Sequence, residues 1–95
     1  MGEPEVRTRF VVHGRVQGVG FRDAVCRFAW RIGGVKGHVR NLRDGSVEAC
    51  VFAASSKMDE MKAFLRRGPP LARVDRLDEH PLEVPPPLGS FCIVY

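Results

Sequence analysis

The sequence has 95 residues, 44% of them hydrophobic, which is enough for one globular core and leaves no room for a second. No apolar run approaches the roughly 20 residues of a membrane-spanning helix, and the first residues lack the apolar core of a signal peptide. We therefore expect one cytoplasmic domain over residues 1–95, with residues 1–5 as a flexible N-terminus and no membrane partner.

The net charge of +4 is distributed unevenly. Residues 1–43 contain nine Lys and Arg against three acids, whereas residues 44–95 contain six against eight. The basic half of the chain therefore favours an anionic partner. Nucleic acid is one such partner, but the cations are scattered singly and no aromatic platform for stacking bases accompanies them, which argues against it.

The residues that commonly bind metals show no metal-binding pattern. The cysteines are an odd number without paired spacing, so we expect reduced, half-buried apolar residues at Cys26, Cys50 and Cys92. The acidic residues give no support for a magnesium site, because they are scattered: Asp23, Asp44, Glu48 and Asp75. We therefore expect no metal and no cofactor.

The first half of the chain predicts a strand, a helix and a hairpin in that order. Residues 6–13 are rich in β-branched and aromatic residues and predict a strand. Apolar residues at intervals of three and four predict a helix over 22–32, which Gly33 and Gly34 end. Strands are expected at 35–42 and 46–53, joined through Asp44-Gly45, because both of these residues tolerate the positive φ of a tight hairpin turn.

The second half predicts another helix and two strands. The helix covers residues 56–66, with Met58, Met61 and Leu65 on one side, and Gly68 ends it. Strands follow at 72–80 and 91–95. The resulting order is that of a ferredoxin-like α+β fold, a split β-α-β-β-α-β sandwich with two helices on one face of an antiparallel sheet and a short C-terminal strand. We expect a monomer.

The glycine-rich segment before the first helix is the strongest candidate for a binding site. Gly14, Gly18 and Gly20 precede Arg22, but neither the Lys-Ser/Thr of a Walker A loop nor the third glycine of a dinucleotide loop is present. Glycines let successive amides converge on an anion, and a helix N-terminus and an arginine add to its attraction. The pattern favours phosphate, although such a loop also serves as a simple tight connection.

Four polar side chains remain as candidates, in two separate segments of the chain. The chain has one asparagine, Asn41, and one glutamine, Gln17. From local sequence alone, Asn41 is either a turn residue beside the hairpin or a site residue, and we interpret Gln17 as shaping the loop. His13 and His38 could serve as general bases, but we expect both to be structural.

Three segments carry a resemblance to a known family. Residues 12–22 (VHGRVQGVGFR) resemble the first signature of the acylphosphatases, and residues 37–48 (GHVRNLRDGSVE) resemble their second. Residues 68–74 (GPPLARV) are similar to the family's exit from the second helix. The similarity runs in order from about residue 6 to residue 95. Two positions depart from the family pattern: His38 replaces a usual aromatic residue, and Ala53-Ala54 stands where a glycine is usual.

The resemblance implies metal-independent hydrolysis of an acyl phosphate to a carboxylate and inorganic phosphate. By position, Arg22 would hold the phosphoryl group and Asn41 would orient the attacking water. The loop amides implied to bind the same group are those of Arg15, Val16, Gln17, Gly18, Val19 and Gly20. The implied partners are a small acyl phosphate as substrate and phosphate or another oxyanion as product or inhibitor.

Two alternatives stay open at the level of sequence. The first is a phosphate-binding or nucleic-acid-binding module without catalysis, although pure binding has no use for a water-positioning amide. The second is the acylphosphatase-like domain of the carbamoyltransferase that matures hydrogenases, whose further zinc-finger regions need Cys-x-x-Cys pairs that this sequence lacks.

Overall fold

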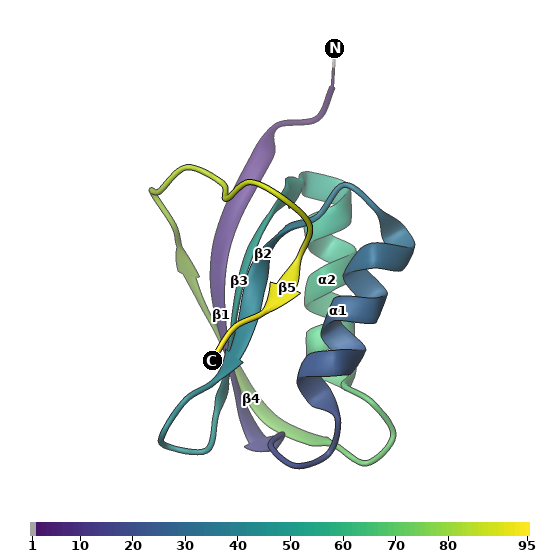
Figure 1. Ribbon diagram of the computed structural model, residues 1–95, viewed down its shortest axis with the longest axis vertical. Coiled ribbons are helices and arrows are strands. Elements are labelled where there is room, and N and C mark those ends of the chain that lie inside the picture. Colours follow the sequence, from purple (N-terminus) through teal and green to yellow (C-terminus); the bar gives the residue numbers. More distant parts are fainter. Residues whose placement is uncertain (1) are drawn as a thin grey trace.

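The computed structural model describes residues 2–95, in five strands and two helices (Figure 1). Met1, part of the N-terminus expected to be flexible, lies outside the described residues. In chain order the elements are β1 (Glu5–Arg15), α1 (Phe21–Ile32), β2 (Lys36–Asn41), β3 (Val47–Ala54), α2 (Ser55–Arg67), β4 (Arg73–Pro81) and β5 (Cys92–Ile93). Every predicted helix and strand is present, with ends that differ by no more than two residues except for the shorter β5.

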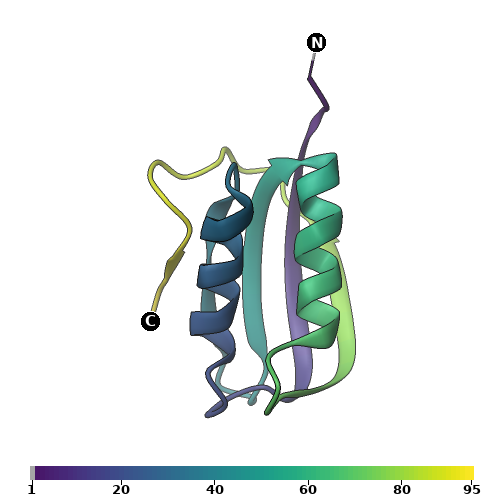
Figure 2. The same ribbon diagram turned by 90° about the vertical axis from the view of Figure 1, so that its right-hand side faces the viewer.

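The strands form one sheet in the order β4-β1-β3-β2-β5. The first four strands of this order pair antiparallel, whereas β5 pairs parallel with β2 and makes the sheet mixed. Both helices cover the same face of the sheet, as the side view shows (Figure 2). These features confirm the ferredoxin-like α+β architecture. Neither of the helices found in residues 2–95 is long and apolar enough to cross a membrane.

The core lies between the sheet and the helices. Alternate residues of β1 and β3 face the helices, and the methionines and leucine predicted for α2 are buried against them. The largest fully buried side chains are Phe10, Phe21, Phe91, Met61 and Leu65. The other face of β3 is buried as well, because β3 lies between β1 and β2 at the centre of the sheet.

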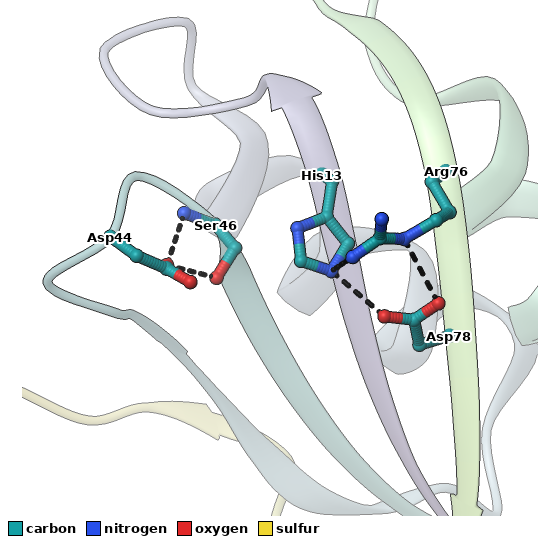
Figure 3. A network of polar contacts seen from close by, with 5 residues as sticks. All are labelled: His13, Asp44, Ser46, Arg76 and Asp78. Carbon is teal, nitrogen blue, oxygen red and sulfur yellow. Dashed lines mark hydrogen bonds and ion pairs between the residues drawn. The ribbon is translucent and has the colours of Figure 1, made fainter.

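The connection between β2 and β3 is longer than the predicted tight hairpin turn. Residues 42–46 form a longer loop, in which the Leu42 N–H donates to the Ser46 carbonyl at 2.9 Å. Only Gly45 has a positive φ, of 96°, so Asp44 contributes in another way. Its carboxylate accepts hydrogen bonds from the hydroxyl and, at 2.9 Å, from the N–H of Ser46 (Figure 3). These bonds lower the pKa of Asp44.

β1 extends two residues beyond its predicted end, through Gly14 and Arg15. Its pairing with β4 shifts register between His13 and Gly14, which marks a bulge. A Cβ at Gly14 would lie 2.1 Å from the Arg73 carbonyl oxygen. Close packing against β4 therefore explains this glycine, and the loop itself begins later, at residue 16.

Near the N-terminus, Glu3 contacts the start of α2. Its carboxylate accepts hydrogen bonds from the Ser56 N–H and from the hydroxyls of Ser55 and Ser56, each at 2.7 Å. Because the N-cap residue Ala54 has no side chain able to accept these bonds, Glu3 satisfies the helix end from outside. Glu5 already belongs to β1. The flexibility expected for residues 1–5 stays a prediction.

Within the described residues, 2–95, all three cysteines are free thiols. Cys26 and Cys50 are buried, whereas Cys92 is exposed, so the partial burial expected from the sequence was wrong for Cys92. Burial raises the pKa of Cys26 to about 11 and also raises that of Cys50. Both buried thiols are therefore protonated near neutral pH, in keeping with the apolar role expected from the sequence.

Candidate active site

The glycine-rich loop, residues 16–20, connects the end of β1 to the start of α1. Gly18 and Gly20 have φ values of 73° and 76°, which side chains with a Cβ adopt only with strain. Val16 is buried in the core and Val19 packs against it, so both ends of the loop are anchored. Gly20 is the N-cap of α1 and offers no side chain to its first N–H groups, which leaves them available to an anion.

Gln17 ties this loop to the β2–β3 connection. Its side-chain Nε2 donates to the Leu42 carbonyl at 2.7 Å and to the Ser46 carbonyl at 2.9 Å. Loop and connection lie at the same end of the sheet, the lower end in Figure 1. The two bonds support the interpretation of Gln17 as the residue that shapes the loop, and they place the loop next to the end of β2.

Arg22 lies in the first turn of α1 and is half-buried. Its guanidinium carbon lies 5.3 Å from the centre of the Tyr95 ring, within the range of a cation–π interaction. No ion pair within residues 2–95 involves Arg22, so no carboxylate of this part of the chain neutralises its charge. The site therefore keeps a positive charge beside the loop amides.

Tyr95 also relates Arg22 to β2. The Val94 N–H donates to the Val39 carbonyl at 3.0 Å, so the last residues continue along β2 beyond β5. The Tyr95 ring under Arg22 thus lies beside the end of β2, where Asn41 is the last residue. Sequence reasoning missed Tyr95, because only the folded chain brings the C-terminal segment to α1.

Asn41 carries a polar atom that the protein itself does not satisfy. Its Oδ1 is buried and has no hydrogen-bond partner among residues 2–95. A buried amide oxygen without a partner is uncommon, since it loses its hydration without compensation. Because Gln17 bonds to Leu42, the residue after Asn41, the Asn41 backbone lies close to the glycine-rich loop.

The predicted phosphate-binding residues fall into two groups. Val16 to Gly20 form the loop itself, whereas Arg15 is the last residue of β1 and pairs with Arg73 of β4. Arg15 therefore lies at the edge of the loop and not within it. The Arg15 side chain forms no ion pair within residues 2–95 either, so it is a second unpaired cation at this end.

His13 forms part of a polar network between β1 and β4 (Figure 3). Its Nε2 lies 2.9 Å from an Asp78 carboxylate oxygen and 3.1 Å from Arg76 Nη2. One imidazole nitrogen cannot donate and accept at once. With the proton on Nε2 it donates to Asp78, and the Arg76 Nη2 contact is then not a hydrogen bond. Burial raises the pKa of Asp78, but the bonds from His13 and Arg76 outweigh it and lower the pKa overall. The contacts account for His13 as a structural residue.

Comparisons with known proteins agree with this geometry. The family model for acylphosphatase matches residues 8–93. A curated acylphosphatase from Thermococcus kodakarensis is 44% identical over 89 residues, which cover 94% of this chain and 96% of that protein. The crystal structure of acylphosphatase from Bacillus subtilis superposes with a TM-score of 0.87 at 30% identity, covering 95% of this chain and 99% of that one.

A larger protein contains a similar fold. The crystal structure of HypF from T. kodakarensis matches with a TM-score of 0.76 at 31% identity, over 97% of this chain but only 12% of that one. The curated relative, in contrast, is matched along nearly its whole length. Together with the family model, which spans most of the sequence, these comparisons show that the chain belongs to the acylphosphatase family.

Proposed function

We propose that Arg22 and the amides of the glycine-rich loop hold the phosphoryl group of an acyl phosphate while Asn41 orients the attacking water. Acyl phosphate hydrolysis is the general activity of the family to which the chain belongs. Beyond this general activity, the proposal assigns a role to each of these residues. These roles depend above all on one observation: the Asn41 Oδ1 is buried without a partner among residues 2–95, at the strand end that Gln17 ties to the loop.

In the proposed step, a water molecule donates a hydrogen bond to Asn41 Oδ1 and directs a lone pair at phosphorus. The new P–O bond forms as the bond from phosphorus to the acyl oxygen breaks, and the carboxylate leaves with the electron pair. Water supplies the oxygen and protons of the resulting phosphate. A carboxylate is a good leaving group, so positioning and charge stabilisation account for most of the catalysis.

Arg22 supports this step through geometry and charge. A guanidinium can bind two oxygens of one phosphoryl group, and the free N–H groups at the start of α1 attract the same anion. The Tyr95 ring restrains the guanidinium before substrate arrives, which lowers the entropy lost on binding. Asn41 stays neutral near physiological pH, so it can accept from water without repelling the phosphate.

The proposal includes hydrolysis without a metal, by a cytoplasmic monomer acting on a small acyl phosphate. The first test is phosphate release from benzoyl phosphate by the wild-type protein with EDTA present. Full activity in EDTA supports a metal-independent reaction. An inactive protein that still binds inorganic phosphate would instead favour a binding module without catalysis.

Two substitutions test the residue roles. We expect Arg22→Ala to lower kcat/KM about 100- to 1000-fold and to weaken phosphate binding, because a positioned charge is lost. Arg27→Ala is the matched control, since Arg27 is exposed on the same helix and pairs with Asp23 at 2.8 Å. Unchanged kinetics in Arg22→Ala would contradict its role.

Asn41→Ala should act differently from Arg22→Ala. We expect kcat to fall about 100-fold or more while the affinity for phosphate changes little, because the amide contacts the water and not the phosphoryl group. Circular dichroism shows whether the variant is folded. A folded Asn41→Ala protein with wild-type kcat would remove the assigned role.

A further inference from the structure

On the sheet face opposite the helices, β2 and β3 bring together a histidine, a carboxylate and a thiol. The register pairs His38 with Cys50 and Arg40 with Glu48. Val39 and Ala49, their neighbours in sequence, face the helical core, so the pleat directs the three side chains to the other face. The possible ligand atoms of His38, Glu48 and Cys50 all lie within 4.8 Å of one another.

The cluster contains a second unsatisfied polar atom of the protein. His38 Nδ1 is buried and has no hydrogen-bond partner among residues 2–95. Glu48 and Cys50 are also buried, with exposed fractions of 4% and 8%. A buried imidazole nitrogen normally has a partner, and an ion is one way to supply it. Nothing in the catalytic proposal uses this atom.

We propose that His38, Glu48 and Cys50 bind a zinc-type divalent cation on this open face of the sheet. One imidazole nitrogen, one thiolate and one carboxylate oxygen are the donors that borderline-soft cations such as Zn²⁺ take, with a fourth position for water. Tetrahedral zinc with its usual bond lengths places ligand atoms about 3.4–3.6 Å apart. The three ligand atoms lie within 4.8 Å of one another, so binding requires them to approach one another to reach that range.

Two arginines limit the affinity of the proposed site. Arg9 Nε lies 2.6 Å from Glu48 Oε2, and Arg40 Nε lies 2.7 Å from Oε1. Each carboxylate oxygen has two lone pairs, so Glu48 can keep an arginine and also bind the cation. The Arg40 side chain is 45% exposed and can turn towards solvent. Its positive charge nevertheless opposes the metal, and Arg40→Gln should strengthen binding.

Binding displaces a proton from Cys50. The thiol loses its proton to solvent as the sulfur–metal bond forms, with no change in oxidation state. Burial raises the pKa of Cys50, with Glu48 adding to the effect, so protons compete with the cation near neutral pH. The charged groups that face this thiol are Glu48, Arg9 and Arg40, and His38 lies beside it in the same cluster.

The test is a cobalt titration of the chelator-treated protein, because Co²⁺ replaces zinc and reports its ligands by absorption. We expect tetrahedral ligand-field bands and a thiolate-to-cobalt charge-transfer band, both removed by added Zn²⁺. Cys50→Ser should lose the charge-transfer band. Cys92→Ser is the matched control, because Cys92 pairs with His38 in the sheet but is exposed and outside the cluster.

His38→Phe extends the test if Cys50→Ser does not fold. We expect it to weaken cobalt binding about 100-fold, since losing a ligand costs at least as much as losing an outer partner. Absence of the charge-transfer band in wild type, its persistence in Cys50→Ser, or its loss in Cys92→Ser would each overturn the proposal. Benzoyl phosphate hydrolysis in EDTA should stay unchanged in the His38 and Cys50 variants, so the outcome is independent of the catalytic roles.

Discussion

Replacing Gly14 by alanine is the change in the glycine-rich segment that we expect to destabilise the fold most. Gly14 has a φ of 131° and lies in the β1–β4 bulge. A Cβ there would lie 2.1 Å from the Arg73 carbonyl oxygen and 2.9 Å from the Asp75 nitrogen. Both atoms belong to the β4 backbone, so the clash cannot be relieved by turning a side chain.

The expected cost has two parts. A positive φ costs an L-residue about 1–2 kcal/mol, and forcing an extra carbon into a packed region costs about 1–3 kcal/mol. The sum, about 2–5 kcal/mol, is a large part of the 5–15 kcal/mol typical of a whole domain. For a chain of this size it corresponds to a decrease in Tm of roughly 10–30 °C.

Gly34→Ala is the control for this prediction. Gly34 has a φ of 72°, but an added Cβ would meet nothing within 4 Å, so only the cost of about 1–2 kcal/mol for the positive φ applies. Urea unfolding followed by circular dichroism gives the free energy of unfolding of both variants. Equal losses in the two variants would refute the argument that close packing against β4 requires Gly14.

Three further predictions concern contacts around the site and the cluster. Gln17→Ala removes two hydrogen bonds to backbone carbonyls, so the free energy of unfolding should fall by about 1–3 kcal/mol and KM should rise, as urea unfolding and steady-state kinetics will show. Tyr95→Ala should weaken phosphate binding about 2- to 5-fold in a calorimetric titration while Tyr95→Phe does not, because the ring restrains Arg22. Burial raises the pKa of Glu48, but bonds from two arginines outweigh it and lower the pKa. The stability from Glu48 is therefore complete above its unfolded pKa and is lost as pH falls through the lower pKa of the folded state. The destabilisation caused by Glu48→Gln should accordingly be largest at neutral pH and decrease as pH falls below about 4.

Local patterns were sufficient to predict the helices and strands. The apolar spacing of α1 and α2 and the glycines after them determine where each helix packs and ends, and both effects act within a few residues. The conformation of the β2–β3 connection was harder to predict. Asp44-Gly45 predicted a tight hairpin turn with positive φ at both residues, but the Asp44 carboxylate bonds to Ser46 within a five-residue loop instead. The competing side-chain bond decided the conformation.

Contacts between segments that are distant in the sequence explain which features of the site the sequence analysis did not find. Arg22 and Asn41 were found from motifs, but the Tyr95 ring beside Arg22 depends on where residues 82–91 lead the chain after β4. Gly14 was assigned to the phosphate loop, whereas its geometry belongs to the pairing with β4. The cluster around His38 was missed because its members come from two strands and meet only in the correct register.

The pleat of β2 explains how one short strand can serve two separate sites. Successive side chains point to opposite faces, so His38 faces the open side while Val39 packs into the core. Asn41, two residues further on, continues the core-facing series and ends the strand beside the glycine-rich loop. β2 pairs with β3 on one side and β5 on the other. The His38 and Asn41 side chains, three residues apart, therefore extend from opposite faces of this strand. Cation binding on one face and hydrolysis at the strand end should therefore vary independently.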